Sequence, residues 1–454
     1  FTYIGFETLE LPASANMNVS LNEDNESLDE IVVIGYGSKN RKDVTGSVSI
    51  VGSETIEKLQ PVDVSQSLQG TTTGVSVSSA SGSPGSGFKF LIRGVSSNSS
   101  NDPLLVVDGY IVSNLNSLNP NDIASLTVLK DAQAAIYGIQ GANGVILVTT
   151  KNGSKNTAPK VTYNAYVGVQ ETTKQLSLLN GAEYAALVNE SYAANGESVP
   201  YSDISNLGKG VDWQNEIFEQ ALMTNHNVSL SGGTENITYY LSGTHLDQDG
   251  IISPEKSNYK RDNIKLNLGV DVNKRLKTTL NLNYFSNERK SISESGLGSV
   301  LFNAISYSPL FALDQEDLNG LFGNEIINPL SQTRDTYNSY SGSSIEGNFQ
   351  LDYKLTDAIK VTSRVGFKTY SDNGKSFAPI VNYGAGKVFN TTRSKVSQSR
   401  NQYDSYTWDS YATYKKLFAE NHNVEATVGM TVIKNWGNGL SGTGYDVPYN
   451  SWDF

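Results

Sequence analysis

Long segments in the second part of the chain alternate between apolar and polar residues. Near residues 160–170, Val161 and Tyr163 share one side of an extended chain, whereas Thr162 and Asn164 share the other. Successive side chains of a β-strand point to opposite faces, so this pattern predicts strands with one apolar and one polar face. We expect nine such strands, near residues 160–170, 224–232, 237–249, 258–272, 277–290, 338–354, 358–371, 401–417 and 422–436.

The connections between these segments alternate in length. Those around 233–236, 273–276, 355–357 and 418–421 are short, those at 171–223, 291–337 and 372–400 are long, and 250–257 is intermediate. Transmembrane β-barrels have this asymmetry, with short periplasmic turns and longer extracellular loops. A soluble β-sandwich has no reason to place its longer loops at every second connection. The pattern therefore predicts an all-β membrane protein with an antiparallel transmembrane barrel.

The region before these strands has a different pattern. Continuous apolar runs at 104–107, 124–129 and 145–149 are typical of strands that are buried on both faces. Residues 62–68 predict a short helix, with Asp63 as its N-cap. We interpret residues 38–155 as a compact α+β domain.

A short apolar segment, DEIVVIGYG at residues 29–37, follows the polar and aperiodic residues 13–27. The polar stretch predicts a flexible tether. An extended segment on such a tether can add as a strand to the exposed sheet edge of a partner protein. Residues 31–34 supply the strand, and Gly35 and Gly37 end it. The alternative is an ordinary buried strand.

Composition excludes several classes of function. The 454 residues include 34 Lys+Arg against 46 Asp+Glu, a net charge of −12 that argues against nucleic-acid binding. No cysteine is present, which suits an oxidising compartment. No nucleophile elbow or phosphate-binding loop is visible, and His226, His245 and His422 are isolated. We interpret these histidines as polar-face or turn residues and expect no enzyme activity, metal or cofactor.

Four motifs, in order along the chain, identify a resemblance. They are LDEIVVIGYG at 28–37, IRGV at 92–95, DPLLVVDGY at 102–110 and LNPNDIASLTVLKDAQAAIYGIQGANGVILVTTKNG at 118–153. In this order they resemble the coupling motif and plug domain of SusC/RagA-type TonB-dependent outer-membrane transporters. The resemblance implies that residues 1–12 end an N-terminal β-sandwich, 13–37 form a tether with the TonB box, 38–155 form the plug inside the lumen, and 160–454 form the first part of the barrel.

The size of the barrel follows from the same resemblance. Barrels that hold a plug have about 22 strands, and an open sheet edge is not tolerated in lipid. We therefore expect roughly nine strands here and favour a fragment of a longer protein; a second chain that completes the barrel is the alternative.

The resemblance also implies a function. It implies TonB-dependent import of bulky nutrients, glycans or oligopeptides, across the bacterial outer membrane, with a SusD-like lipoprotein as a lid and with TonB and membrane lipid as partners. The alternative is a barrel of the same kind that serves as a structural or assembly subunit of a larger outer-membrane complex.

The resemblance gives roles to two sets of site residues. The TonB box comprises Asp29, Glu30, Ile31, Val32, Val33, Ile34, Gly35, Tyr36 and Gly37. Charged residues at the ends of buried strands should be paired. The resemblance implies that such residues latch the plug to the barrel wall, and the candidates are Arg93, Asp108, Lys130 and Asp131. The alternative is that they pair locally within the plug. Gly138, Gly141 and Gly144 predict turns with positive φ or close backbone approach. Gln140 stands where the family often carries an arginine, which slightly favours the structural subunit.

Overall fold

The structure is a computed structural model that describes residues 19, 31–34, 37–40, 47–79, 81–98, 100–293, 295–320, 323–418 and 422–453. The chain divides into two units. The first comprises Phe1–Ser78, Phe88–Asn152 and Asn348–Gln350, and the second comprises Ser79–Gly87, Gly153–Gly347 and Leu351–Phe454. The predictions for residues 1–12 and for most of the tether lie outside the described residues.

The first unit is built on a mixed five-stranded sheet. Its strands lie in the order β3 (Val48–Gly52), β8 (Ile123–Leu129), β9 (Val145–Thr150), β6 (Leu104–Val107) and β7 (Tyr110–Val112). Strand β6 runs parallel to β9, and the other pairs are antiparallel. A two-stranded sheet of β4 (Val75–Ser79) and β5 (Phe88–Ile92) accompanies it. The predicted α+β domain is therefore present, and we call it the plug.

Short helices complete the plug. They are α1 (Ser53–Leu59) and the 3₁₀ helices η3 (Val64–Leu68), η4 (Pro120–Asp122) and η5 (Asp131–Gly141). The predicted cap of η3 is confirmed, since the Asp63 carboxylate accepts a hydrogen bond from the Ser65 backbone N–H at 2.7 Å. The Gln66 side chain accepts in turn from the Asp63 backbone N–H, which closes a reciprocal capping box.

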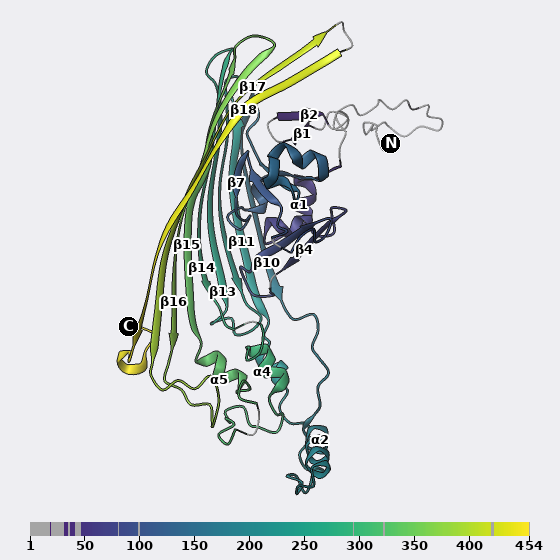
Figure 1. The fold of residues 1–454 in the computed structure, drawn as a ribbon, viewed down its shortest axis with the longest axis vertical. Coiled ribbons are helices and arrows are strands. Elements are labelled where there is room, and N and C mark those ends of the chain that lie inside the picture. Colours follow the sequence, from purple (N-terminus) through teal and green to yellow (C-terminus); the bar gives the residue numbers. More distant parts are fainter. Residues whose placement is uncertain are drawn as a thin grey trace. The chain divides into compact units, whose positions relative to one another are not determined.

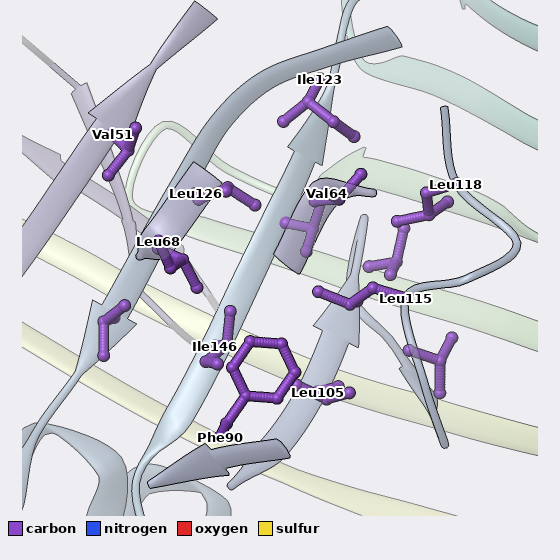
Figure 2. Packing of buried hydrophobic residues seen from close by; sticks show 14 of the residues in the cluster. Val51, Val64, Leu68, Phe90, Leu105, Leu115, Leu118, Ile123, Leu126 and Ile146 are labelled. Atoms are coloured by element: carbon purple, nitrogen blue, oxygen red, sulfur yellow. The ribbon is translucent and has the colours of Figure 1, made fainter. Parts of the chain in front are cut away.

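Apolar side chains cover both faces of the plug sheet. Ile146 and Val148 lie in one buried cluster, where Figure 2 shows Ile146 close to Phe90. Val145 and Leu147, their neighbours in sequence, lie in a second buried cluster with Ala134 of η5. Consecutive residues of a strand thus enter opposite cores, which explains the continuous apolar runs.

The second unit contains a nine-stranded antiparallel sheet in which each strand pairs with its neighbours in sequence (Figure 1). The strands are β10 (Thr157–Gln170), β11 (Ala221–Gly233), β12 (Ile237–Asp249), β13 (Asn258–Asp271), β14 (Leu276–Lys290), β15 (Tyr337–Lys354), β16 (Ile359–Ala378), β17 (Lys395–Phe418) and β18 (His422–Tyr445). The nine predicted strands and the alternation of short and long connections are confirmed. Strands β16, β17 and β18 extend beyond their predicted ends. The sequence did not predict the added segments, because they are mostly polar and lack a clear alternation.

In a soluble protein the buried face of a sheet is apolar, but in this sheet the polar face is buried and the apolar face is exposed. Asn267 and Lys265 are 1% exposed, whereas Ile264 is 53% exposed. The buried polar face contains ion pairs, such as Arg364 with Asp409 at 2.8 Å. An apolar outer face with a polar inner face is the arrangement of a transmembrane barrel, in which lipid covers the apolar side chains.

Two histidines do not lie on the face that the sequence predicted. His226 and His245 alternate with the buried residues of β11 and β12 and lie on the apolar face, not on the polar face. The Tyr163 hydroxyl lies 2.8 Å from Nδ1 of His226, and Nδ1 of His245 lies 2.7 Å from a carboxylate oxygen of Asp262. Polar side chains therefore interrupt the apolar face on these strands.

The long connections fold together. They contain the helices α2 (Gly181–Ala194), α3 (Trp213–Ile217), α4 (Val300–Ser306) and α5 (Pro329–Arg334), and the 3₁₀ helix η6 (Pro448–Asn450) follows β18. A buried cluster joins α3 and α4 through Trp213, Val300 and Tyr307, and the Trp213 indole N–H donates to the Ser308 carbonyl at 2.9 Å. We call the folded connections 171–220, 250–257, 291–336 and 379–394 the loop module. No helix in the described parts of the chain is long and apolar enough to cross a membrane.

Candidate functional site

The predicted coupling segment contains a strand. Ile31–Ile34 form β1, which pairs antiparallel with β2 (Gly37–Asn40) from Ile31 opposite Asn40 to Ile34 opposite Gly37. Gly37 therefore begins a second strand instead of ending the first. Residues 29, 30, 35 and 36 of the predicted box lie outside the described residues. Strand β1 also contacts β8 and β9 of the plug sheet.

Asp108 stabilises a tight turn within the plug. Asp108 and Gly109 have φ values of 45° and 87°, the positive values of a two-residue hairpin turn between β6 and β7. The Asp108 carboxylate accepts hydrogen bonds from the Thr150 backbone N–H at 2.9 Å and from the Thr150 hydroxyl at 2.7 Å. These contacts join the turn to the end of β9, and the Asp108 carbonyl accepts a further hydrogen bond from the Asn348 side chain at 3.0 Å.

Lys130 is 3% exposed at the end of β8. Its ammonium group donates to the Ser49 hydroxyl at 2.9 Å and to the Thr73 carbonyl. Both acceptors belong to the plug, so these contacts favour local pairing. A buried lysine needs such acceptors, because an uncompensated charge in the interior is costly.

Arg93 lies at a sharp change of direction after β5. Its φ is 59°, and its backbone N–H donates to the Gly74 carbonyl at 2.8 Å. The Arg93 side chain is exposed. The side chain of Asp131, the fourth latch candidate, lies outside the described residues.

The three predicted glycines meet the expected backbone conditions. Gly138 has a φ of 61° and Gly144 a φ of 88°. A Cβ atom at Gly141 would lie 2.3 Å from the Ala134 carbonyl oxygen, and one at Gly144 would lie 2.7 Å from Cδ1 of Ile92. The prediction of positive φ or close approach is confirmed, and these glycines shape η5 and its return into β9.

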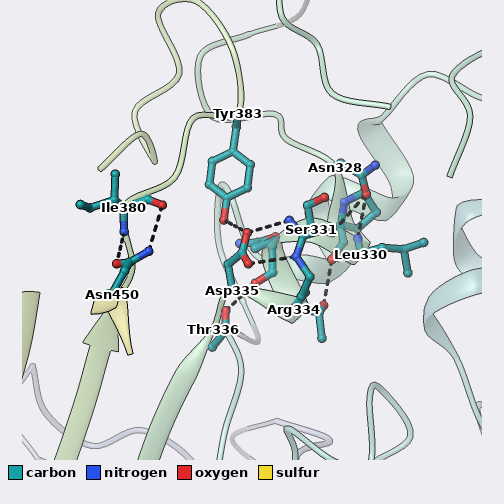
Figure 3. A network of polar contacts seen from close by, with 12 residues as sticks. Asn328, Leu330, Ser331, Arg334, Asp335, Thr336, Ile380, Tyr383 and Asn450 are labelled. Carbon is teal, nitrogen blue, oxygen red and sulfur yellow. Dashed lines mark hydrogen bonds and ion pairs between the residues drawn. The ribbon is translucent and has the colours of Figure 1, made fainter. Parts of the chain in front are cut away.

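The loop module contains polar contacts that the sequence interpretation missed. Lys387 and Asp317 form an ion pair at 2.7 Å with side chains 0% and 1% exposed. Figure 3 shows a second network in which Asp335 lies between Arg334 and the Tyr383 hydroxyl, which donates to the carboxylate at 3.1 Å. Burial, and then the nearby Asp335 carboxylate, raises the pKa of Tyr383.

A further contact joins the loop module to η6. Ile380 donates its backbone N–H to the Asn450 side chain at 2.7 Å, as Figure 3 shows. Burial also raises the pKa of Glu316 in the same module. No sequence period marks these residues, because they lie in irregular loops. Among the described residues, no group of three or more His, Asp or Glu side chains is placed to hold a metal ion.

Comparison with known proteins identifies relatives of both units. Residues 40–145 match the family model described as the TonB-dependent receptor plug domain. TonB-dependent receptor P3 of Formosa agariphila is 34% identical over 450 residues, which cover 96% of this chain and 43% of that protein. TonB-dependent receptor SusC of Bacteroides thetaiotaomicron is 39% identical over 321 residues, which cover 68% of this chain and 31% of that protein. The chain thus spans less than half the length of these two relatives.

A solved structure has the same fold. The structure of the RagAB peptide transporter aligns with a TM-score of 0.78 and 23% sequence identity, over 90% of this chain and 50% of that one.

Proposed function

Because this chain belongs to the SusC/RagA family of TonB-dependent outer-membrane transporters, we propose that it takes part in the active import of bulky nutrients, glycans or oligopeptides, through a plugged barrel. Its location is the bacterial outer membrane. The observation that carries the proposal is the presence in one chain of a plug domain, a nine-stranded sheet with an exposed apolar face, and a short strand, β1, in the segment that we propose for coupling.

The proposed mechanism begins at the loop end of the barrel. Cargo binds there, and the tether that carries β1 becomes available on the periplasmic side. TonB then adds a strand to β1, because backbone hydrogen bonds along a strand resist pulling. Force transmitted through the tether displaces or remodels the plug, and cargo passes.

A SusD-like lipoprotein is the proposed lid. The loop module supports this proposal, since its buried ion pair and aromatic cluster give the long loops a preformed surface. A preformed surface suits a permanent partner, because little ordering is required on binding. For the plug latch, Arg93, Asp108, Lys130 and Asp131 remain our candidates.

Deletion of residues 29–37 from the full-length transporter tests the proposed coupling. We expect uptake to cease while the barrel still assembles and cargo still binds, because the deletion removes only the strand that TonB engages. An equal-length deletion in the polar tether, residues 16–24, is the matched control and should retain uptake. Uptake that survives the loss of residues 29–37 would contradict TonB-driven import.

The second candidate function is that of a structural subunit. Gln140, which is exposed in the structure, replaces the arginine that the family often carries. Native purification separates the two functions: a transporter should copurify with a single lipoprotein and cargo, whereas a structural subunit should copurify with a larger assembly.

A further inference from the structure

Three tyrosines form a row on the polar face of the nine-stranded sheet. Tyr340, Tyr370 and Tyr403 lie on the consecutive strands β15, β16 and β17. Tyr370 is directly opposite Tyr403, and their rings stack with centroids 6.3 Å apart and planes 27° apart. The hydroxyl groups of Tyr340 and Tyr370 are hydrogen-bonded to each other. The row therefore joins three tyrosines on neighbouring strands, one pair by ring stacking and the other by a contact between hydroxyl groups.

Within the row, exposure is greatest at Tyr403 on β17, whereas Tyr340 and Tyr370 are half-buried. Closer to the short turns, Arg364, Asp409 and Glu346 are 8%, 3% and 0% exposed. Tyr403, which lies nearer the long loops, is 53% exposed. On the loop side of the row Asp372 is again 7% exposed, so the accessible part of this surface is the Tyr403 ring.

Glycines on the next strand leave room beside the row. Gly437 is opposite Tyr403 and Gly439 is opposite Asn401. A Cβ atom at Gly437 would lie 2.9 Å from Cδ1 of the Tyr403 ring, and one at Gly439 would lie 2.4 Å from Oδ1 of Asn401. Larger residues at either position would displace the ring or the amide, so the glycines preserve this surface.

Polar groups adjoin the row on its loop side. The Asn401 side-chain N–H donates to the Asp372 carboxylate at 2.8 Å. This pair places an amide and a carboxylate beside the rings; Asp372 is 7% exposed and Asn401 is half-buried, so the amide is the more accessible of the two groups. An aromatic face with an adjacent amide and carboxylate suits a ligand that has a flat C–H surface and a rim of hydroxyl groups.

We propose that Tyr340, Tyr370 and Tyr403, with Asp372 and Asn401, form a sugar-binding subsite on the inner wall of the barrel. The inference rests on the proposed import function and selects glycan over peptide as its cargo. A hexose ring stacks its C–H face on the tyrosines, and its hydroxyl groups bond to the carboxylate and the amide. Strands β15, β16 and β17 each have a neighbour on both sides, so their backbone groups are not available to bind an extended peptide as an added strand.

Calorimetry on the purified full-length transporter tests the subsite. The probes are maltohexaose, cellohexaose, laminarihexaose, an inulin-type fructan and a hexapeptide mixture. We expect one glycan to bind. Tyr403→Ala should lower the affinity for that glycan by about fivefold to tenfold, and Tyr403→Phe should change it by less than about twofold. Tyr406→Ala, on the apolar face of the same strand, is the matched control and should leave affinity unchanged. Gly437→Val, whose side chain would displace the Tyr403 ring, should weaken glycan binding as Tyr403→Ala does.

Two results would overturn the subsite. One is glycan affinity that is unchanged in Tyr403→Ala and Gly437→Val variants whose barrels assemble normally; the other is binding of the peptide mixture with no glycan bound. If peptides bind and deletion of residues 29–37 stops their uptake, the import function stands without this subsite. If a glycan binds through Tyr403 but its uptake survives that deletion, the subsite stands and TonB-driven import fails.

Discussion

In the plug sheet, Ile146 and Val148 are shielded from water, and the strands contribute apolar side chains to both faces. In the nine-stranded sheet, Lys265 and Asn267 occupy the shielded positions, and the neighbouring Ile264 is left open. The two sheets are built from the same backbone geometry and differ in what surrounds them. Protein covers both faces of the first, whereas lipid covers one face of the second.

This difference shows that hydrophobicity alone does not predict which side chains are buried. A strand with alternating residues has one face for each environment, and the environment decides which face is exposed. The mean hydropathy of the chain is −0.34, because the polar face of the barrel offsets the apolar one. An introduced charge should therefore be costly at a buried position of the plug sheet and at an exposed apolar position of the nine-stranded sheet.

The largest effect is expected in the plug core. Ile146→Arg places a charge at a position that is 0% exposed, and we expect the plug to lose its fold at a cost above about 4 kcal/mol. The nine-stranded sheet should still assemble, because its strands do not use this core. Limited proteolysis of the full-length protein measures both outcomes. Ser125→Arg, at a half-buried position on β8, is the control. If the plug of the Ile146→Arg variant stays resistant to protease, the conclusion that both faces of the plug sheet are buried is contradicted.

A smaller effect is expected on the lipid face. Ile264→Arg, at the middle of β13 on the apolar face, should reduce the stability of the folded protein by about 2–4 kcal/mol, the cost of arginine near the bilayer midplane. Asn267, on the polar face of the same strand, is 1% exposed and therefore a poor control for an introduced arginine. Ser405→Arg, half-buried on the polar face of β17, is the better control. Urea unfolding in lipid vesicles measures the free energy of unfolding. An equal loss of stability in the lipid-face variant and in Ser405→Arg would contradict the assignment of one apolar and one polar face.

The smallest effect is expected at the turn between β6 and β7. Asp108→Ala removes the acceptor for two hydrogen bonds from Thr150, at a cost of about 1–2 kcal/mol. Asp108→Asn should cost less, because asparagine keeps one acceptor and tolerates positive φ. Hydrogen exchange of the Thr150 amide reports the change, with the exposed Asp102→Ala as the control. Unchanged protection in Asp108→Ala would mean that the turn does not stabilise β9.

Much of the fold could be predicted because regular strands have a regular period. The nine strands, their order and the alternation of connection lengths follow from residues such as Val161 and Thr162, whose alternation reflects one lipid-facing and one lumen-facing side. The ends of β17 and β18 could not be predicted, because both faces become polar there. Ser331 illustrates the loops: it lies in a long polar connection yet is 3% exposed inside the loop module.

The backbone conformation at the candidate site could be predicted from the sequence, but the residues that its side chains contact could not. Gly141 and Gly144 could be predicted because close approach and positive φ restrict the residue type. The partners of Lys130 could not, since Ser49 is 81 positions away and a hydroxyl carries no sequence signal for a distant ammonium group. The tyrosine row was missed for a similar reason. Its members belong to three strands, and only the register of the sheet brings Tyr370 opposite Tyr403.

The buried ion pair of the loop module has a consequence for the order of assembly. Asp317 precedes β15 and Lys387 follows β16, so the 70-residue separation between them contains that whole hairpin. The two side chains can meet only after both strands have inserted and paired. Lys387 is then shielded from trypsin, whereas in a half-inserted chain it is a cleavage site. Resistance to cleavage at Lys387 therefore marks the moment in biogenesis when the hairpin is complete.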